Sequence, residues 1–129
     1  LERQAEEAIL EMDGIEDVAV NRKTIDLSND TASVSLSVDS DSVVTSIDYY
    51  QTNSQKISIK LKSSKSIIVK VSLYDANTEG KPILEETKEL GVIFNTTWTF
   101  RGLSNDKTYY FTIENLGQID VSVTGTVTD

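Results

Sequence analysis

The stretch KISIKLKSSKSIIVKVSL, residues 56–73, decides the fold class. In both of its halves an apolar residue stands at every second position, and lysine or serine fills most of the positions between. A period of two is typical of β-strands that have one buried face and one face in water. The stretch therefore predicts two amphipathic strands.

The same period extends along most of the chain. A weaker run at 83–90 predicts an edge strand, and residues 18–27 could form a first strand. Residues 1–13 have apolar residues at spacings of three and four, which predicts a short helix. The other alternating runs cover residues 34–38, 43–49, 92–100, 109–113 and 119–123. In three of these runs we expect the core side to consist of Val43, Thr45, Ile47 and Tyr49, of Val92, Phe94, Thr96, Trp98 and Phe100, and of Ile119, Val121 and Val123.

Regular short strands separated by turns predict an all-β fold in one domain, residues 1–129. We expect a two-sheet antiparallel β-sandwich over residues 18–129, either immunoglobulin- or fibronectin-like or a jelly roll. The short N-terminal helix over residues 1–13 would accompany this sandwich.

The segment 98–123 contains Leu103, Thr108 and Tyr109 at the spacing of a tyrosine corner. It resembles the corner before strand F of fibronectin type III and immunoglobulin-like domains, with Asn105 at the usual proline position. Residues 72–75 and 115–117 also look like parts of small bacterial secreted sandwiches such as pre-peptidase C-terminal domains. These resemblances imply a fold and no activity. From the tyrosine corner we expect Tyr109 to be buried, with its hydroxyl bonded to backbone between Gly102 and Asn105.

Composition excludes several kinds of chemistry. The chain has no cysteine and no histidine, so thiol, Ser-His-Asp and histidine–zinc sites cannot form. The net charge is −9. Residues 1–30, with nine acids and three bases, carry most of that imbalance. This charge disfavours nucleic acid as a partner, and no apolar run is long enough for direct membrane insertion. We expect no enzymatic activity and no cofactor.

One segment imitates a calcium-binding loop. Oxygen-bearing side chains stand at loop positions one, three, five and twelve, with glycine at position six. These residues are Asp75, Asn77, Glu79 and Glu86. We expect a polar hairpin turn here and keep calcium as the weaker alternative.

Two groups of side chains are candidate binding residues, because alternation predicts that they point away from the core. The first is a lysine stripe on what we take to be two neighbouring strands, formed by Lys56, Lys60, Lys62 and Lys70. It could dock an acidic partner or polymer, including the acidic segment of the same or another copy, or it could serve solubility alone. The second group could stack on sugar rings and consists of Tyr50, Tyr74 and Tyr110.

The function that these patterns favour is a non-catalytic module for protein binding or assembly, including self-association. We expect a bacterial protein that is secreted or at the cell surface. One alternative is a carbohydrate-binding module. A second is a pilin-like filament subunit, in which residues 1–13 would be the end of a longer helix.

Overall fold

The computed structural model describes residues 23–78 and 80–129, and within them it contains two β-sheets and no helix, hence none able to cross a membrane. This confirms the all-β, two-sheet prediction. The helix predicted over residues 1–13 lies outside the described residues. The six-stranded sheet contains β1 (Thr24–Asp26), β3 (Val43–Thr45), β4 (Tyr49–Gln51), β6 (Ile67–Asp75), β7 (Leu84–Leu90) and β9 (Tyr109–Asn115). The four-stranded sheet contains β2 (Ala32–Val38), β5 (Lys56–Ser63), β8 (Thr96–Arg101) and β10 (Val121–Thr128).

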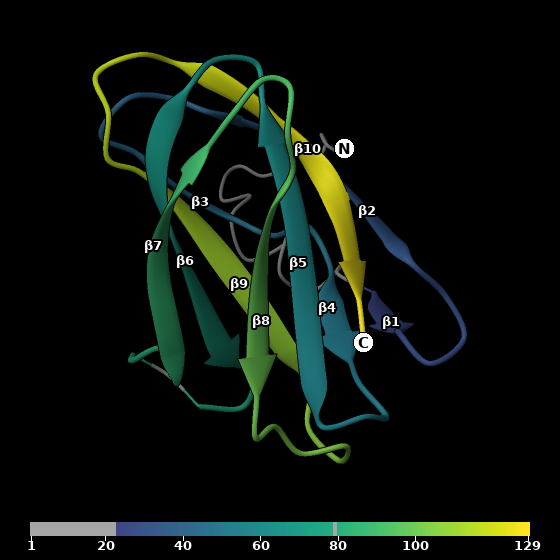
Figure 1. Cartoon of the computed structure of the whole chain (residues 1–129). Helices are drawn as coiled ribbons and strands as arrows, with labels where there is room; N and C mark the ends of the chain where they lie inside the picture. Colours follow the sequence, from purple (N-terminus) through teal and green to yellow (C-terminus); the bar gives the residue numbers. More distant parts are fainter. Residues whose placement is uncertain (1–22, 79) are drawn as a thin grey trace.

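The two sheets lie in separate layers, with β5 and β8 in front of β6 and β9 in Figure 1. The strand order is β2-β10-β5-β8 in one sheet and β1-β4-β9-β6-β7 in the other, where β3 also pairs with β9. The predicted antiparallel pairing holds except at β1, which pairs with β4 in parallel. The antiparallel pairs are nested along the chain: β2 pairs with β10, β3 and β4 with β9, β5 with β8, and β6 with β7. The chain from β2 to β10 is therefore one long hairpin folded over on itself. The strand predicted over 83–90 is confirmed as an edge, because β7 pairs only with β6.

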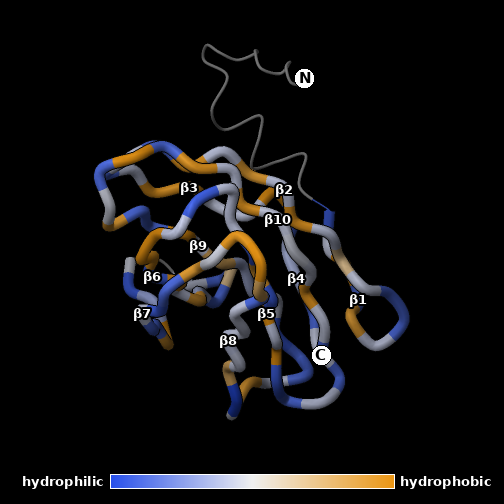
Figure 2. Tube along the Cα trace, turned by 45° about the horizontal axis from the view of Figure 1, so that its top comes forward, coloured by the Kyte–Doolittle hydropathy of each residue, from blue (hydrophilic) through white to orange (hydrophobic). Residues whose placement is uncertain are grey.

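Alternation places the core between the layers. Figure 2 shows hydrophobic and hydrophilic residues interspersed along the strands, as expected when only one face of each is buried. The fully buried Trp98 on β8 donates its indole N–H to the carbonyl oxygen of Glu86 on β7, at 2.8 Å. This bond joins the two sheets and satisfies the one polar atom of that side chain.

The predicted tyrosine corner is confirmed. Tyr109 is buried, and its hydroxyl oxygen accepts a hydrogen bond of 2.8 Å from the backbone N–H of Ser104. Leu103, in the loop before β9, is also buried. The bond holds the 102–108 loop against the start of β9.

The prediction that Val43, Thr45, Ile47 and Tyr49 point inward is wrong, because the positions that are buried here are even-numbered. Val43 and Ile47 are 57% and 63% exposed, whereas Ser46 and Tyr50 are buried. The hydroxyl of Ser46 explains this burial, since it donates to the carbonyl oxygen of Asp48 at 3.0 Å and accepts from the N–H of Phe111 at 3.3 Å. A serine with two backbone partners can occupy an inward position that apolar character alone would assign to its neighbours.

Two other predicted runs begin too early. Val92 and Phe94 are half exposed, because residues 91–95 form the turn between β7 and β8, and the strand starts at Thr96. Ile119 is likewise exposed in the turn before β10. The inward positions predicted for the later residues of both runs are confirmed: Trp98, Phe100, Val121 and Val123.

Candidate functional site

The outer face of the four-stranded sheet has an unusual composition. Every outward-facing residue on its four strands is serine, threonine, lysine or arginine, and the strands themselves, all within the described residues, contain no acid. We call this surface the hydroxyl–lysine face. It consists of Ser33, Ser35 and Ser37 on β2, Ser122, Thr124, Thr126 and Thr128 on β10, Lys56, Ser58, Lys60 and Lys62 on β5, and Thr97, Thr99 and Arg101 on β8.

Strand pairing arranges these side chains in rows across the sheet. Lys60 stands between Thr126 on β10 and Thr97 on β8. Neighbouring strands are about 4.8 Å apart, and residues two positions apart on one strand are separated by about 6.7 Å. Lys56 and Lys62, at the ends of the row on β5, are therefore about 20 Å apart. The result is a line of positive charges that has hydroxyl groups on both sides at its centre, around Ser58 and Lys60.

The cations of this face have no ion-pair partner among residues 23–78 and 80–129. By contrast, Lys70, Lys88 and Lys107, which lie elsewhere, form ion pairs with acids at 3.4–3.8 Å. Lys56 also stands directly opposite Arg101, and like charges at such a position destabilise a sheet. The arrangement therefore does not serve the stability of the fold.

Protection of a sheet edge does not explain the lysines either. Charged side chains on edge strands prevent pairing with other chains. However, β5 is an interior strand, paired with β10 on one side and β8 on the other. Solubility or binding remain as reasons for the lysines of β5.

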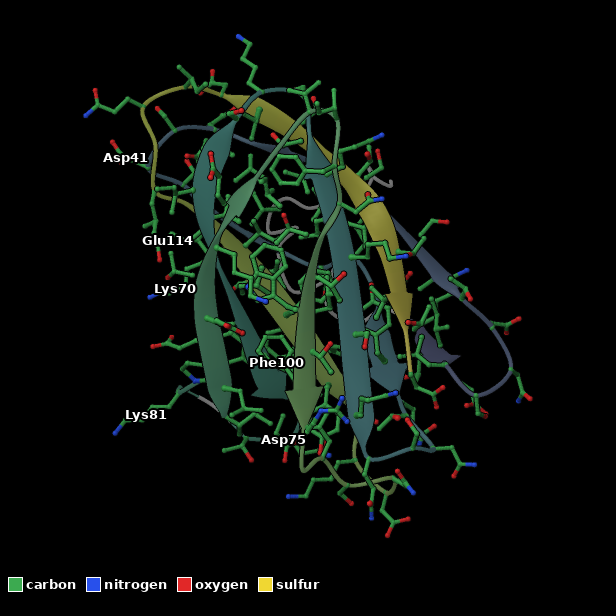
Figure 3. All side chains as sticks on the ribbon, in the orientation of Figure 1. Asp41, Lys70, Asp75, Lys81, Phe100 and Glu114 are labelled. Carbon is green, nitrogen blue, oxygen red and sulfur yellow. The ribbon has the colours of Figure 1, made fainter. Side chains whose placement is uncertain are left out.

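The lysine stripe predicted from the sequence is corrected in one member. Lys70 lies on β6 of the six-stranded sheet, because residues 64–66 carry the chain from one sheet to the other. There its ammonium group is 3.5 Å from a carboxylate oxygen of Glu114, beside it in Figure 3, and 3.7 Å from one of Glu85. Lys70 is thus on the opposite surface of the sandwich, with acidic neighbours.

The tyrosine group is corrected as well. Tyr50 is only 2% exposed and stacks on Phe111 in the core, whereas Tyr49 takes the outward position. Tyr110 lies between Tyr49 and Tyr74 on the outer surface of the six-stranded sheet. The rings of Tyr74 and Tyr110 stack on each other at 4.9 Å, with 4° between their planes. Their facing surfaces are therefore covered, and a sugar ring cannot stack between them.

Asp75 and Glu86, the first and last residues of the calcium-like loop, are not brought together. Val71 is opposite Glu86 in the β6–β7 pair, so Glu86 is about four residues, or 13 Å, along the sheet from Asp75. Asp75 instead accepts the backbone N–H of Asn77 at 2.9 Å and pairs with Lys107 at 3.4 Å. These contacts, the Asn77 bond foremost, lower the pKa of Asp75 below its ordinary 3.8. In the described part of the chain no three acidic side chains are close enough to hold a metal ion, and Glu79 lies outside that part.

Exposed apolar side chains gather elsewhere, at the end of the sandwich that contains the 91–95 and 116–120 turns. Ile93 is 92% exposed, and Val92, Phe94, Leu116 and Ile119 are each exposed by more than two-fifths.

Two open depressions, of about 320 and 310 Å³, lie among other loops of the described residues. The first is lined in part by Asp75, Arg101 and Lys107, and the second in part by Asp26, Gln51 and Asn105.

Sequence reasoning missed most of the hydroxyl–lysine face. Arg101 and the threonines of β8 and β10 join it only because these strands flank β5, although they follow it by dozens of residues in the chain. The sequence feature that could have revealed it is the serine or threonine at every second position over residues 33–37 and 122–128. This pattern predicts solvent-facing sides of strands, but it does not say which strands are neighbours.

Comparison of the chain with protein-family models, with curated proteins and with solved structures finds no match.

Proposed function

We propose that this domain is a non-catalytic binding module, and that the hydroxyl–lysine face is its contact surface for a negatively charged partner. The observation that carries the proposal is the absence of any acid from four strands, all described, of a chain whose net charge is −9. At physiological salt the Debye length is about 8 Å, so a partner at this face meets mainly the local positive charges. We place the module in a secreted or cell-surface protein, as its composition suggests.

We further propose that the sandwich is a jelly roll. In the immunoglobulin order the last strand pairs with strand F in its sheet. Here β10 lies between β2 and β5, in the sheet opposite to β9. The nested pairing of β2 with β10 and of β3 and β4 with β9 supports a rolled hairpin of the jelly-roll kind.

Retention on a negatively charged support tests the binding proposal. We expect the protein to bind a carboxymethyl matrix at pH 7 and low salt despite its net charge. The double variant Lys60→Glu/Lys62→Glu should flow through. The matched control Lys23→Glu/Lys81→Glu makes the same change of charge at exposed lysines off the face, and should be retained like the parent protein. Figure 3 shows Lys81 projecting from the β6–β7 hairpin.

Two results would contradict the proposal. One is a parent protein that flows through the matrix at every salt concentration. The other is elution of Lys60→Glu/Lys62→Glu at the same salt concentration as the control variant, which would mean that the lysines of β5 do not make the contact.

A further inference from the structure

We propose that the partner is an acidic polysaccharide whose chain lies along β5. This inference rests on the proposed function of the hydroxyl–lysine face and names the ligand class of that face. The structure supports it in three ways, through what the face lacks, through its hydroxyl groups and through the line of its charges.

The face lacks what protein partners bind. Protein interfaces depend on buried aromatic, aliphatic or arginine anchors, and their compositions are depleted in lysine and serine. The outward residues of these four strands include no apolar or aromatic side chain, and their one arginine, Arg101, is exposed at the end of β8. The exposed apolar side chains of the described residues lie off this face, for example Ile93 and Phe94 in a turn at the end of the sandwich and Ile68 on β6 of the other sheet.

Hydroxyl groups suit a sugar chain because each can donate and accept a hydrogen bond, as can each sugar hydroxyl. On this face the side chains of Ser58 and Thr99 bond to each other at 3.4 Å. The hydroxyls of Thr124, Thr126 and Thr97 bond to no other described side chain and remain open to a ligand. Ordered water can bridge such groups to sugar hydroxyls at little energetic cost.

The charges form a line and not a cluster. Lys56, Lys60 and Lys62 follow one strand over about 20 Å. Lys60 has threonine beside it on both β10 and β8, and Lys62 has threonine beside it on β10. A linear polymer that repeats carboxylates between hydroxyl-bearing rings would place its anions over β5 and its hydroxyls over both flanking strands. A single-stranded nucleic acid would instead require aromatic side chains for base stacking, and this face has none.

The test compares polymers of similar charge and different chemistry. Affinities are measured in solution at fixed salt for alginate, poly-L-glutamate, single-stranded DNA and neutral dextran. We expect alginate to bind most tightly and dextran not to bind. Lys60→Glu/Lys62→Glu should weaken alginate binding by roughly tenfold or more.

Removal of hydroxyl groups separates a sugar ligand from a general polyanion. Thr124→Val/Thr126→Val keeps the side-chain shape and the charge, and Thr87→Val on β7 of the other sheet is the matched control. We expect the double variant to lose alginate affinity about fivefold or more, since two hydrogen bonds are removed, and to bind polyglutamate unchanged. The inference is overturned if polyglutamate or DNA binds as tightly as alginate, or if the double valine variant binds alginate like the parent. If Lys60→Glu/Lys62→Glu binds every anionic polymer as tightly as the parent protein, the proposed function itself is refuted.

Discussion

Replacement of Tyr109 by phenylalanine removes a single oxygen atom from the tyrosine corner. The ring would stay in the core, but the backbone N–H of Ser104 would lose its acceptor, which lies 2.8 Å away in the structure. A fully buried donor without a partner costs about 1–3 kcal/mol. Ser104 is half-buried, so water can reach it in part, and we expect the free energy of unfolding to fall by about 1–2 kcal/mol.

Urea denaturation followed by Trp98 fluorescence measures this change, because Trp98 is fully buried in the native state. Tyr74→Phe is the matched control, since it also removes one hydroxyl but leaves the half-exposed ring stacked on Tyr110. We expect this control to change stability by less than about 0.5 kcal/mol. If both variants unfold at the same urea concentration as the parent protein, the hydroxyl of Tyr109 does not stabilise the 102–108 loop.

Three further predictions concern the same fold. Millimolar calcium should leave the melting temperature unchanged, because Asp75 and Glu86 are not neighbours; a clear rise that a chelator reverses would contradict this. The lowered pKa of Asp75 stabilises the fold above pH 3.8, and this stability is lost as the pH falls through the folded-state pKa. Asp75→Asn should therefore be less stable at pH 7 and lose less stability on acidification, and equal slopes of stability against pH would exclude this role. Gly125→Ala should cost about 1–3 kcal/mol in urea denaturation, because its Cβ would lie 1.8 Å from the carbonyl oxygen of Lys60; stability equal to that of Thr124→Ala would contradict the close approach of β10 to β5.

Much of the fold could be predicted from local pattern. The inward positions of β5 and β6 follow from strict alternation, as Ile59, Leu61 and Val71 illustrate, and all three are fully buried. The tyrosine corner is also local, because Leu103 and Tyr109 are separated by only one turn. Where a buried polar residue replaces an apolar one, as at Ser46, the pattern is misleading and the predicted side of the strand is wrong.

The candidate site depends on pairing between distant segments, which a single sequence does not reveal. Lys62 and Lys70 are eight residues apart and both point outward, but the crossing at 64–66 places them on opposite surfaces. Thr126 and Lys60 are far apart in the chain and are direct neighbours in the sheet. The β6–β7 register likewise separates Asp75 from Glu86, although their spacing in the sequence imitates a calcium loop.

Amide chemical-shift mapping with a short oligo-uronate tests the central claim most directly. In ¹⁵N-labelled protein we predict that the amides of β5, β8 and β10 shift most, centred on the row of Thr126, Lys60 and Thr97. Those shifts should shrink as salt is added, because charge makes the contact. Shifts centred instead on Tyr74 and Tyr110, on the far sheet, or on the 91–95 turn would contradict the assignment of the hydroxyl–lysine face as the binding surface.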